Sequence, residues 1–125
     1  MPDVKTILIC DDEPSLRELM RISLHEAYSF AEASDAAEAI ELVDRVRPDL
    51  VLLDVMMPGA SGLTVIEWLR SDPELSHTPV LVISAFAAES DRLAALDAGA
   101  TGFLKKPFDP EELETVVEEL LAARN

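Results

Sequence analysis

The length, composition and charge of the chain narrow the class of protein. Its 125 residues, 49% of them apolar, suffice for a single domain over residues 1–125 with a buried core. The 25 acidic residues outnumber the 10 basic ones and give a formal net charge of −15, so the summed field repels nucleic acids and anionic membrane surfaces. We therefore expect neither direct nucleic-acid binding nor membrane binding.

Cysteine content and hydropathy predict a cytoplasmic location. The single cysteine, Cys10, has no partner for an internal disulfide and lies in an apolar run, so we interpret it as a core residue in a reducing compartment. No apolar stretch approaches the roughly 20 residues of a membrane span, and no charged-then-apolar leader opens the chain.

Strand and helix patterns alternate along the chain. Short apolar runs rich in β-branched residues predict strands, whereas apolar residues spaced by three or four predict amphipathic helices. The elements expected are a strand at 4–10, a helix at 15–26, a weaker strand at 29–32, a helix at 36–46, a strand at 50–53, a helix at 63–69, a strand at 80–83, a helix at 93–98, a weaker strand at 102–104 and a helix from Pro110 to at least 121, capped by Asp109.

This alternation predicts an α/β fold. Nearly continuous apolar strands are typical of a parallel sheet covered by helices on both faces. The (βα)₅ order, with right-handed crossovers, gives a doubly wound parallel sheet whose ligand crevice lies at the carboxyl ends of the strands.

Polar residues follow four of these strands. Asp11, Asp12 and Glu13 follow the first, Asp54 the third, Ser84 the fourth, and Lys105-Lys106-Pro107 the fifth. Carboxylates gathered at one edge would repel one another unless a cation neutralised them, and Mg²⁺ is a hard ion that prefers oxygen ligands. The pattern therefore predicts a divalent-cation site.

Each of these motifs also has a purely structural interpretation. The aspartate pair could be a helix-capping turn, Asp54 a turn residue, Ser84 a helix cap and Lys106 a solvated surface charge. The conjunction favours phosphate chemistry, because independent turns would not all fall at the ends of neighbouring strands.

The whole chain resembles the receiver domains of response regulators in two-component signalling. That family carries an acidic pair, a phospho-accepting Asp, a Ser or Thr and a Lys in this order, and Ser84 and Lys106 follow Asp54 by 30 and 52 residues. The segments Asp54-Val-Met-Met-Pro-Gly and Lys106-Pro-Phe are similar to its most recognisable stretches. The resemblance implies the flavodoxin-like receiver fold with strand order 2-1-3-4-5, an order for which a receiver is a known example.

The resemblance also implies a mechanism. Asp54 would accept a phosphoryl group from the phosphohistidine of a histidine kinase or histidine phosphotransfer protein, or from acetyl phosphate. Mg²⁺, or Mn²⁺ in its place, would be held by Asp12, Asp54, the main-chain carbonyl of Met56 and, directly or through water, Asp11. Lys106, Ser84 and the backbone N–H of Ala85 would contact the phosphoryl oxygens, so the protein would be a self-modifying switch rather than an enzyme.

Further features of the family bear on output. Phe103 stands at the aromatic switch position, and the Lys106–Pro107 peptide is expected to be cis. The apolar residues Met56 and Phe86 would slow dephosphorylation, unless they are loop residues without kinetic consequence. With no effector domain after the last helix, output would pass to a partner through the fourth helix, fifth strand and fifth helix, unless the sequence is an excised piece of a longer regulator. Thr101-Gly102, in place of an acidic pair, disfavours the family's symmetric phosphorylation-dependent dimer.

Three rival functions remain open. A phosphatase of the haloacid dehalogenase type needs a second Asp two residues after its nucleophile, where Asp11 is followed by Glu13. A flavodoxin needs a loop rich in Ser, Thr and Gly after the first strand, where this chain has Asp-Asp-Glu-Pro. A receiver fold that serves only as an unphosphorylated docking platform would not need the full set of reactive residues.

Overall fold

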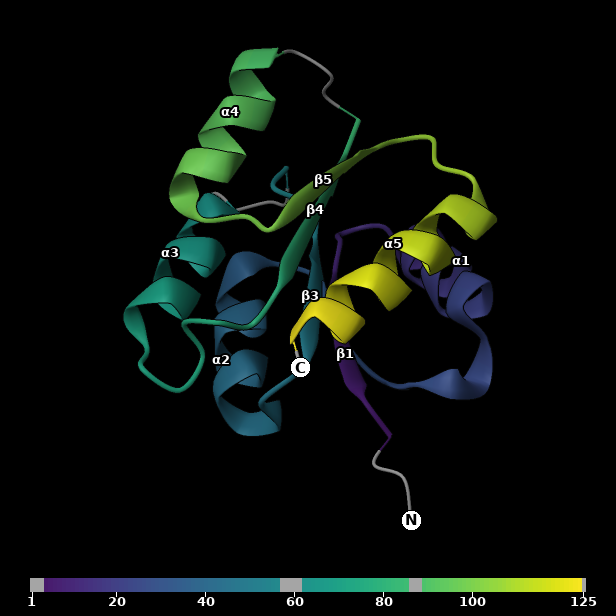
Figure 1. Cartoon of the computed structure of the whole chain (residues 1–125), viewed down its shortest axis with the longest axis horizontal. Helices are drawn as coiled ribbons and strands as arrows, with labels where there is room; N and C mark the ends of the chain where they lie inside the picture. Colours follow the sequence, from purple (N-terminus) through teal and green to yellow (C-terminus); the bar gives the residue numbers. More distant parts are fainter. Residues whose placement is uncertain (1–3, 57–61, 86–88, 125) are drawn as a thin grey trace.

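The computed structural model describes residues 4–56, 62–85 and 89–124 and places five parallel strands in one sheet. The strand order is β2-β1-β3-β4-β5, as expected for a doubly wound (βα)₅ fold. Figure 1 shows the strands at the centre with helices on both sides. In chain order the elements are β1 (Thr6–Cys10), α1 (Pro14–Leu24), a 3₁₀ turn (His25–Ala27), β2 (Ser29–Ala33), α2 (Ala36–Val46), β3 (Leu50–Leu53), α3 (Leu63–Ser71), β4 (Val80–Ser84), α4 (Glu89–Ala98), β5 (Gly102–Lys105) and α5 (Pro110–Arg124).

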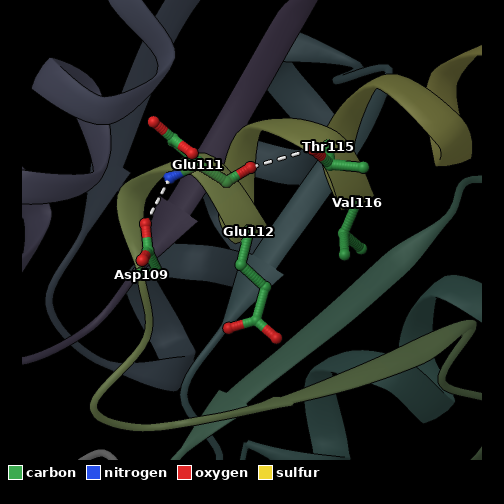
Figure 2. Close-up of a pocket in the computed structure, with 5 residues that line it drawn as sticks. All are labelled: Asp109, Glu111, Glu112, Thr115 and Val116. Atoms are coloured by element: carbon green, nitrogen blue, oxygen red, sulfur yellow. Dashed lines mark hydrogen bonds between the residues drawn. The ribbon is translucent and has the colours of Figure 1, made fainter.

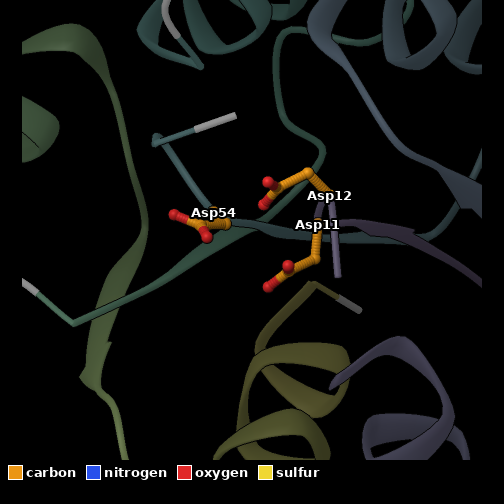
Figure 3. Close-up of side chains that lie close together, drawn as sticks. All are labelled: Asp11, Asp12 and Asp54. Carbon is orange, nitrogen blue, oxygen red and sulfur yellow. The ribbon is translucent and has the colours of Figure 1, made fainter. Parts of the chain in front are cut away.

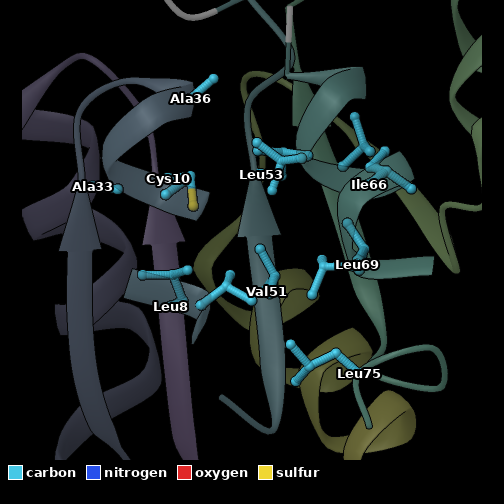
Figure 4. Close-up of a cluster of buried hydrophobic side chains, with 14 of the residues drawn as sticks. Leu8, Cys10, Ala33, Ala36, Val51, Leu53, Ile66, Leu69 and Leu75 are labelled. Atoms are coloured by element: carbon cyan, nitrogen blue, oxygen red, sulfur yellow. The ribbon is translucent and has the colours of Figure 1, made fainter. Parts of the chain in front are cut away.

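The sheet separates two hydrophobic cores, because successive strand residues point to opposite faces. One face packs against α2, α3 and α4, and Figure 4 shows part of this core around Leu8, Val51 and Leu69. The other packs against α1 and α5 through residues such as Met20 and Val117. The central strands are buried on both faces, which explains their continuous apolar sequence.

Several boundaries differ by one to four residues from those expected from the sequence, and three of them are explained by the structure. The first strand begins at Thr6 because Val4, at 62% exposure, lies outside the core. Helix α1 ends at Leu24 because the next residue, His25, has a φ of 60°. Helix α4 begins at Glu89, four residues before the expected start. The sequence does not signal this first turn, because Ala95 is the one buried side chain of the helix and the apolar periodicity is weak.

Local capping fixes where two helices start. At α2 the Asp35 side chain accepts the Glu38 N–H at 2.8 Å, while the Glu38 carboxylate accepts the Ser34 N–H at 2.7 Å. At α5 the expected cap is confirmed, since Oδ1 of Asp109 accepts the Glu111 N–H at 2.9 Å (Figure 2).

Because all the strands are parallel, their carboxyl ends meet at one edge of the sheet. The residues that follow β1, β3, β4 and β5 are therefore neighbours in space. Within the described parts of the chain, no helix combines the length and apolar character that crossing a bilayer requires.

Candidate functional site

A cluster of three carboxylates lies at this edge of the sheet. One oxygen each of Asp11, Asp12 and Asp54 lies within 4.8 Å of the others (Figure 3). Strand pairing causes the approach, because Cys10 and Leu53 are partners in register and the Asp54 N–H donates to the Cys10 carbonyl at 2.9 Å. Asp11 is fully buried and Asp54 is 6% exposed, whereas Asp12 is exposed.

Lys106 brings a positive charge into this cluster. Its ammonium nitrogen lies 2.8 Å from Oδ2 of Asp11 and 2.9 Å from Oδ2 of Asp54. Burial by itself lowers the pKa of Lys106, but hydrogen bonds and charge attraction from the two aspartates outweigh it and raise the pKa above the ordinary value for lysine. The side chain is therefore a fixed cation at neutral pH.

The cluster fits a divalent cation. Three carboxylates against one ammonium leave a formal excess of negative charge, and charges at this spacing repel one another unless neutralised. Among the described residues, none donates a hydrogen bond to the Asp12 carboxylate, which is therefore free to bind an ion. Oxygen ligands of this type, with access to water, suit Mg²⁺ or Mn²⁺.

The two buried aspartates are held by their own loops as well as by Lys106. Oδ1 of Asp11 accepts the Glu13 N–H at 2.9 Å, and Oδ1 of Asp54 accepts the Met56 N–H at 2.9 Å. These bonds fix both carboxylates before any ligand arrives, which is the preorganisation that a reactive site needs.

Ser84 and its neighbours lie at the adjacent strand ends. Ser84 is buried at the end of β4, and its carbonyl accepts the Lys106 N–H at 2.8 Å. Ala85, which follows it, is exposed. The structure thus places Ser84 beside the Lys106 backbone, while contacts of the Ser84 hydroxyl, the Ala85 N–H and the Met56 carbonyl with a ligand stay predictions.

The fifth strand directs its side chains as expected. Phe103 is half-buried and packs against the core that α2, α3 and α4 cover. Lys105 is exposed, and Lys106 alone of the pair reaches the carboxylates. The Lys106–Pro107 peptide is cis, also as expected. Phe86 lies outside the described residues.

Sequence reasoning missed two arginines that bind main-chain oxygens, one beside the carboxylate cluster and one at the opposite edge of the sheet, before β4 and β5 begin. Arg17 of α1 donates to the Asp11 carbonyl at 2.6 Å and to the Glu32 carboxylate at 2.9 Å. Arg70 of α3 donates to the Gly99 carbonyl at 3.0 Å and to the Thr78 carbonyl at 2.7 Å. Periodicity identifies buried apolar faces but gives no signal for a long polar side chain that binds main-chain oxygens.

A hollow on the surface lies apart from the carboxylate cluster. It lies along the first turns of α5 and is lined by Asp109, Glu111, Glu112, Thr115 and Val116 (Figure 2). Glu111 and Glu112 lie on the first turn of α5, and Asp109 caps that helix. No described cation neutralises them in the way that Lys106 neutralises the cluster at the strand ends.

Comparison with known proteins identifies the class. The model of the response regulator receiver domain family matches residues 7–118. Response regulator MprA of Mycobacterium leprae is 47% identical over 92% of this chain and 50% of that protein. The DNA-binding dual master transcriptional regulator RpaA of Synechocystis is 39% identical over 92% of this chain and 48% of that protein. The chain thus spans about half the length of the curated relatives it matches.

Solved structures agree. A putative response regulator from Chloroflexus aurantiacus superposes with a TM-score of 0.90 at 33% identity, covering 96% of this chain and 99% of that one. The chemotaxis response regulator CheY4 of Vibrio cholerae superposes with a TM-score of 0.88 at 28% identity, covering 94% of this chain and 99% of that one. The chain belongs to the response regulator receiver domain family and has its flavodoxin-like fold. Membership in this signalling family favours neither the phosphatase nor the flavodoxin interpretation.

Proposed function

We propose that Asp54 is the phospho-acceptor of a two-component receiver. The observation that carries this assignment is the contact between its carboxylate and the Lys106 ammonium at 2.9 Å. Asp11 is fully buried and out of reach of a donor, and Asp12 has no described cation beside it to balance a transferred phosphoryl group. Asp54 combines slight exposure with a fixed positive charge.

The proposed reaction is an in-line phosphoryl transfer. An oxygen of Asp54 forms a bond to phosphorus while the bond from phosphorus to the donor imidazole nitrogen breaks, and the imidazole takes up a proton. The product is an aspartyl phosphate, a mixed anhydride. With acetyl phosphate as the donor, acetate leaves instead. Lys106 stays charged and stabilises the negative charge on the transferred oxygens.

The residues proposed to hold Mg²⁺ are Asp12, Asp54, the Met56 carbonyl and, directly or through water, Asp11. A bound Mg²⁺ supplies charge neutralisation at the phosphoryl oxygens and orients the donor. The protein's own contribution is to keep the three carboxylates within 4.8 Å of one another before the ion binds.

The proposal also includes a conformational change on phosphorylation and a partner that binds the changed surface. The Ser84 hydroxyl and the Ala85 N–H bind phosphoryl oxygens, and Phe103 changes its position in response. The changed surface includes α4, β5 and α5 and is read by a downstream effector in the cytoplasm, with no separate enzymatic activity and no direct contact with nucleic acid. The acidic hollow on α5 supports a partner with basic groups (Figure 2).

Intact-mass spectrometry after incubation with acetyl phosphate and Mg²⁺ tests the proposal. The parent is expected to gain the mass of one phosphoryl group, and Asp54→Ala is expected to gain none. Omitting Mg²⁺ should slow the gain strongly. An unmodified parent at a donor concentration that labels another receiver domain would favour the docking-platform alternative.

A further inference from the structure

Four hydrogen bonds to different parts of the chain hold Asp11. Its N–H donates to the Ala33 carbonyl at 3.0 Å, and its carboxylate accepts from Glu13 and Lys106. The fourth bond joins its carbonyl oxygen to Nη1 of Arg17 at 2.6 Å. This last bond is the one that fixes the orientation of the peptide unit between Asp11 and Asp12.

That peptide unit directs Asp12. A peptide is planar, so fixing the carbonyl of Asp11 fixes the N–H and the Cα of Asp12 as well. The Asp12 carboxylate itself receives no hydrogen bond from any described residue. Its direction toward Asp54 therefore depends on the backbone that Arg17 holds.

Arg17 is itself held in place by Glu32. Nε of Arg17 lies 2.9 Å from Oε1 of Glu32 on β2, and the Arg17 side chain is only 17% exposed. Arg21, one turn later on α1, lies 3.1 Å from the other Glu32 oxygen and is 42% exposed, and no contact with the Asp11 peptide is observed for it. The two arginines share one carboxylate and differ in their contact with the Asp11–Asp12 peptide.

We propose that Arg17 is a positioning residue for the divalent-cation site: it holds the Asp11–Asp12 peptide so that the Asp12 carboxylate faces Asp54. The proposal rests on the cation site of the proposed function. Because Arg17 is itself positively charged, its electrostatic effect and its positioning effect on cation binding have opposite signs. The direction in which Mg²⁺ affinity changes when Arg17 is replaced therefore tells the two effects apart. By charge alone, removing Arg17 would strengthen Mg²⁺ binding, because a repulsive cation would be lost. By position, its removal weakens binding.

Calorimetric titration of the unphosphorylated protein with MgCl₂ separates these effects. Arg17→Met keeps most of the aliphatic stem but has no donor, and we expect it to weaken Mg²⁺ binding about 10-fold or more, as loss of a partner behind a metal ligand does. Arg21→Met removes the same charge from the same carboxylate and should stay within about twofold of the parent. Arg17→Lys has one ammonium group in place of the guanidinium that reaches both the Asp11 carbonyl and the Glu32 carboxylate. Its Mg²⁺ affinity should therefore lie between those of the parent and Arg17→Met.

The outcomes are distinguishable. Mg²⁺ binding by Arg17→Met as tight as in the parent, or tighter, overturns the positioning role and leaves the proposed function intact. Equal weakening in Arg21→Met overturns it as well, because the effect would then come from Glu32 or from α1 as a whole. A parent that binds no Mg²⁺ overturns both proposals. Thermal unfolding without Mg²⁺ identifies any unfolded variant, and if Arg17→Met is unfolded, Arg17→Lys is judged by the same comparison with the parent and Arg21→Met.

Discussion

The ammonium nitrogen of Lys106 lies 2.9 Å from Oδ2 of Asp54, although 52 residues separate them in the sequence. The contact forms because β5 and β3 end at the same edge of the parallel sheet. When no divalent cation is bound, the Lys106 ammonium is the positively charged group, among the described residues, that contacts the carboxylates of the cluster. It therefore contributes to the stability of the fold as well as to its chemistry.

Lys106→Met should destabilise the cation-free protein. The change leaves the Asp11 and Asp54 carboxylates close together without the ammonium group that contacts both, and we expect the free energy of unfolding to fall by about 1–3 kcal/mol. Lys105→Met is the matched control, because its side chain is exposed, and it should change stability by less than about 0.5 kcal/mol. Urea denaturation of the two variants measures the difference. Equal effects would mean that the carboxylates do not depend on Lys106 for neutralisation.

Mg²⁺ should stabilise the folded chain. A ligand that binds only the folded state adds about 2.7 kcal/mol at 100 times its dissociation constant, so the Tm should rise with Mg²⁺ concentration. Asp12→Asn should abolish most of this rise by removing the carboxylate that is free to bind the ion. Asp97→Asn, on the exposed surface of α4, should keep it. Identical Mg²⁺ responses in both variants would argue against a site at Asp12.

Gly99→Ala should destabilise the connection between α4 and β5. Gly99 has a φ of 113°, and an added Cβ would lie 2.9 Å from Cγ of Arg70, whose hydrogen bond to Thr78 restricts its movement. We expect a loss of about 1–2 kcal/mol. Gly102→Ala is the control, because its Cβ would meet only Cδ1 of Leu81 at 3.3 Å. Chemical denaturation should show a clearly larger loss for Gly99→Ala, and equal losses would contradict the strain argument.

The order of elements and the acidic cluster were predictable from the sequence because each has a local signal. Continuous apolar runs predicted the buried strands, and the parallel topology brings Asp11, Asp54 and Lys106 to one edge. The strand order came from the family resemblance, since local patterns do not determine which strands are neighbours.

The start of α4, the end of α1 and the arginine contacts were not predictable in this way. Helix α4 buries only Ala95, so its first turn has no apolar signature. The end of α1 depends on the positive φ of His25, which the apolar spacing of the sequence does not signal. The bonds of Arg17 and Arg70 to carbonyl oxygens depend on three-dimensional positions that no spacing rule encodes.

Cys10 should make the protein less stable at alkaline pH. Burial, and then the nearby charges of Asp11 and Glu38, raise the pKa of the thiol, so the folded chain keeps its proton while the unfolded chain loses it. This stability is fully present below the unfolded pKa of about 8.5 and falls above it, by up to about 1.4 kcal/mol per pH unit. Denaturation between about pH 8 and 10, below the region where Tyr28 titrates, measures the slope. The free energy of unfolding of Cys10→Ala should lack this decrease with pH. Equal slopes in the parent and in Cys10→Ala would contradict the effect assigned to the thiol.

The central claim is that Asp54 becomes a mixed anhydride. Borohydride reduces an aspartyl phosphate to homoserine, so peptide sequencing by tandem mass spectrometry after acetyl phosphate, Mg²⁺ and borohydride identifies the acceptor directly. We predict homoserine at position 54 and only in protein treated with the donor. Homoserine at position 11 or 12, or at no position in protein that has gained phosphoryl mass, would contradict the assignment.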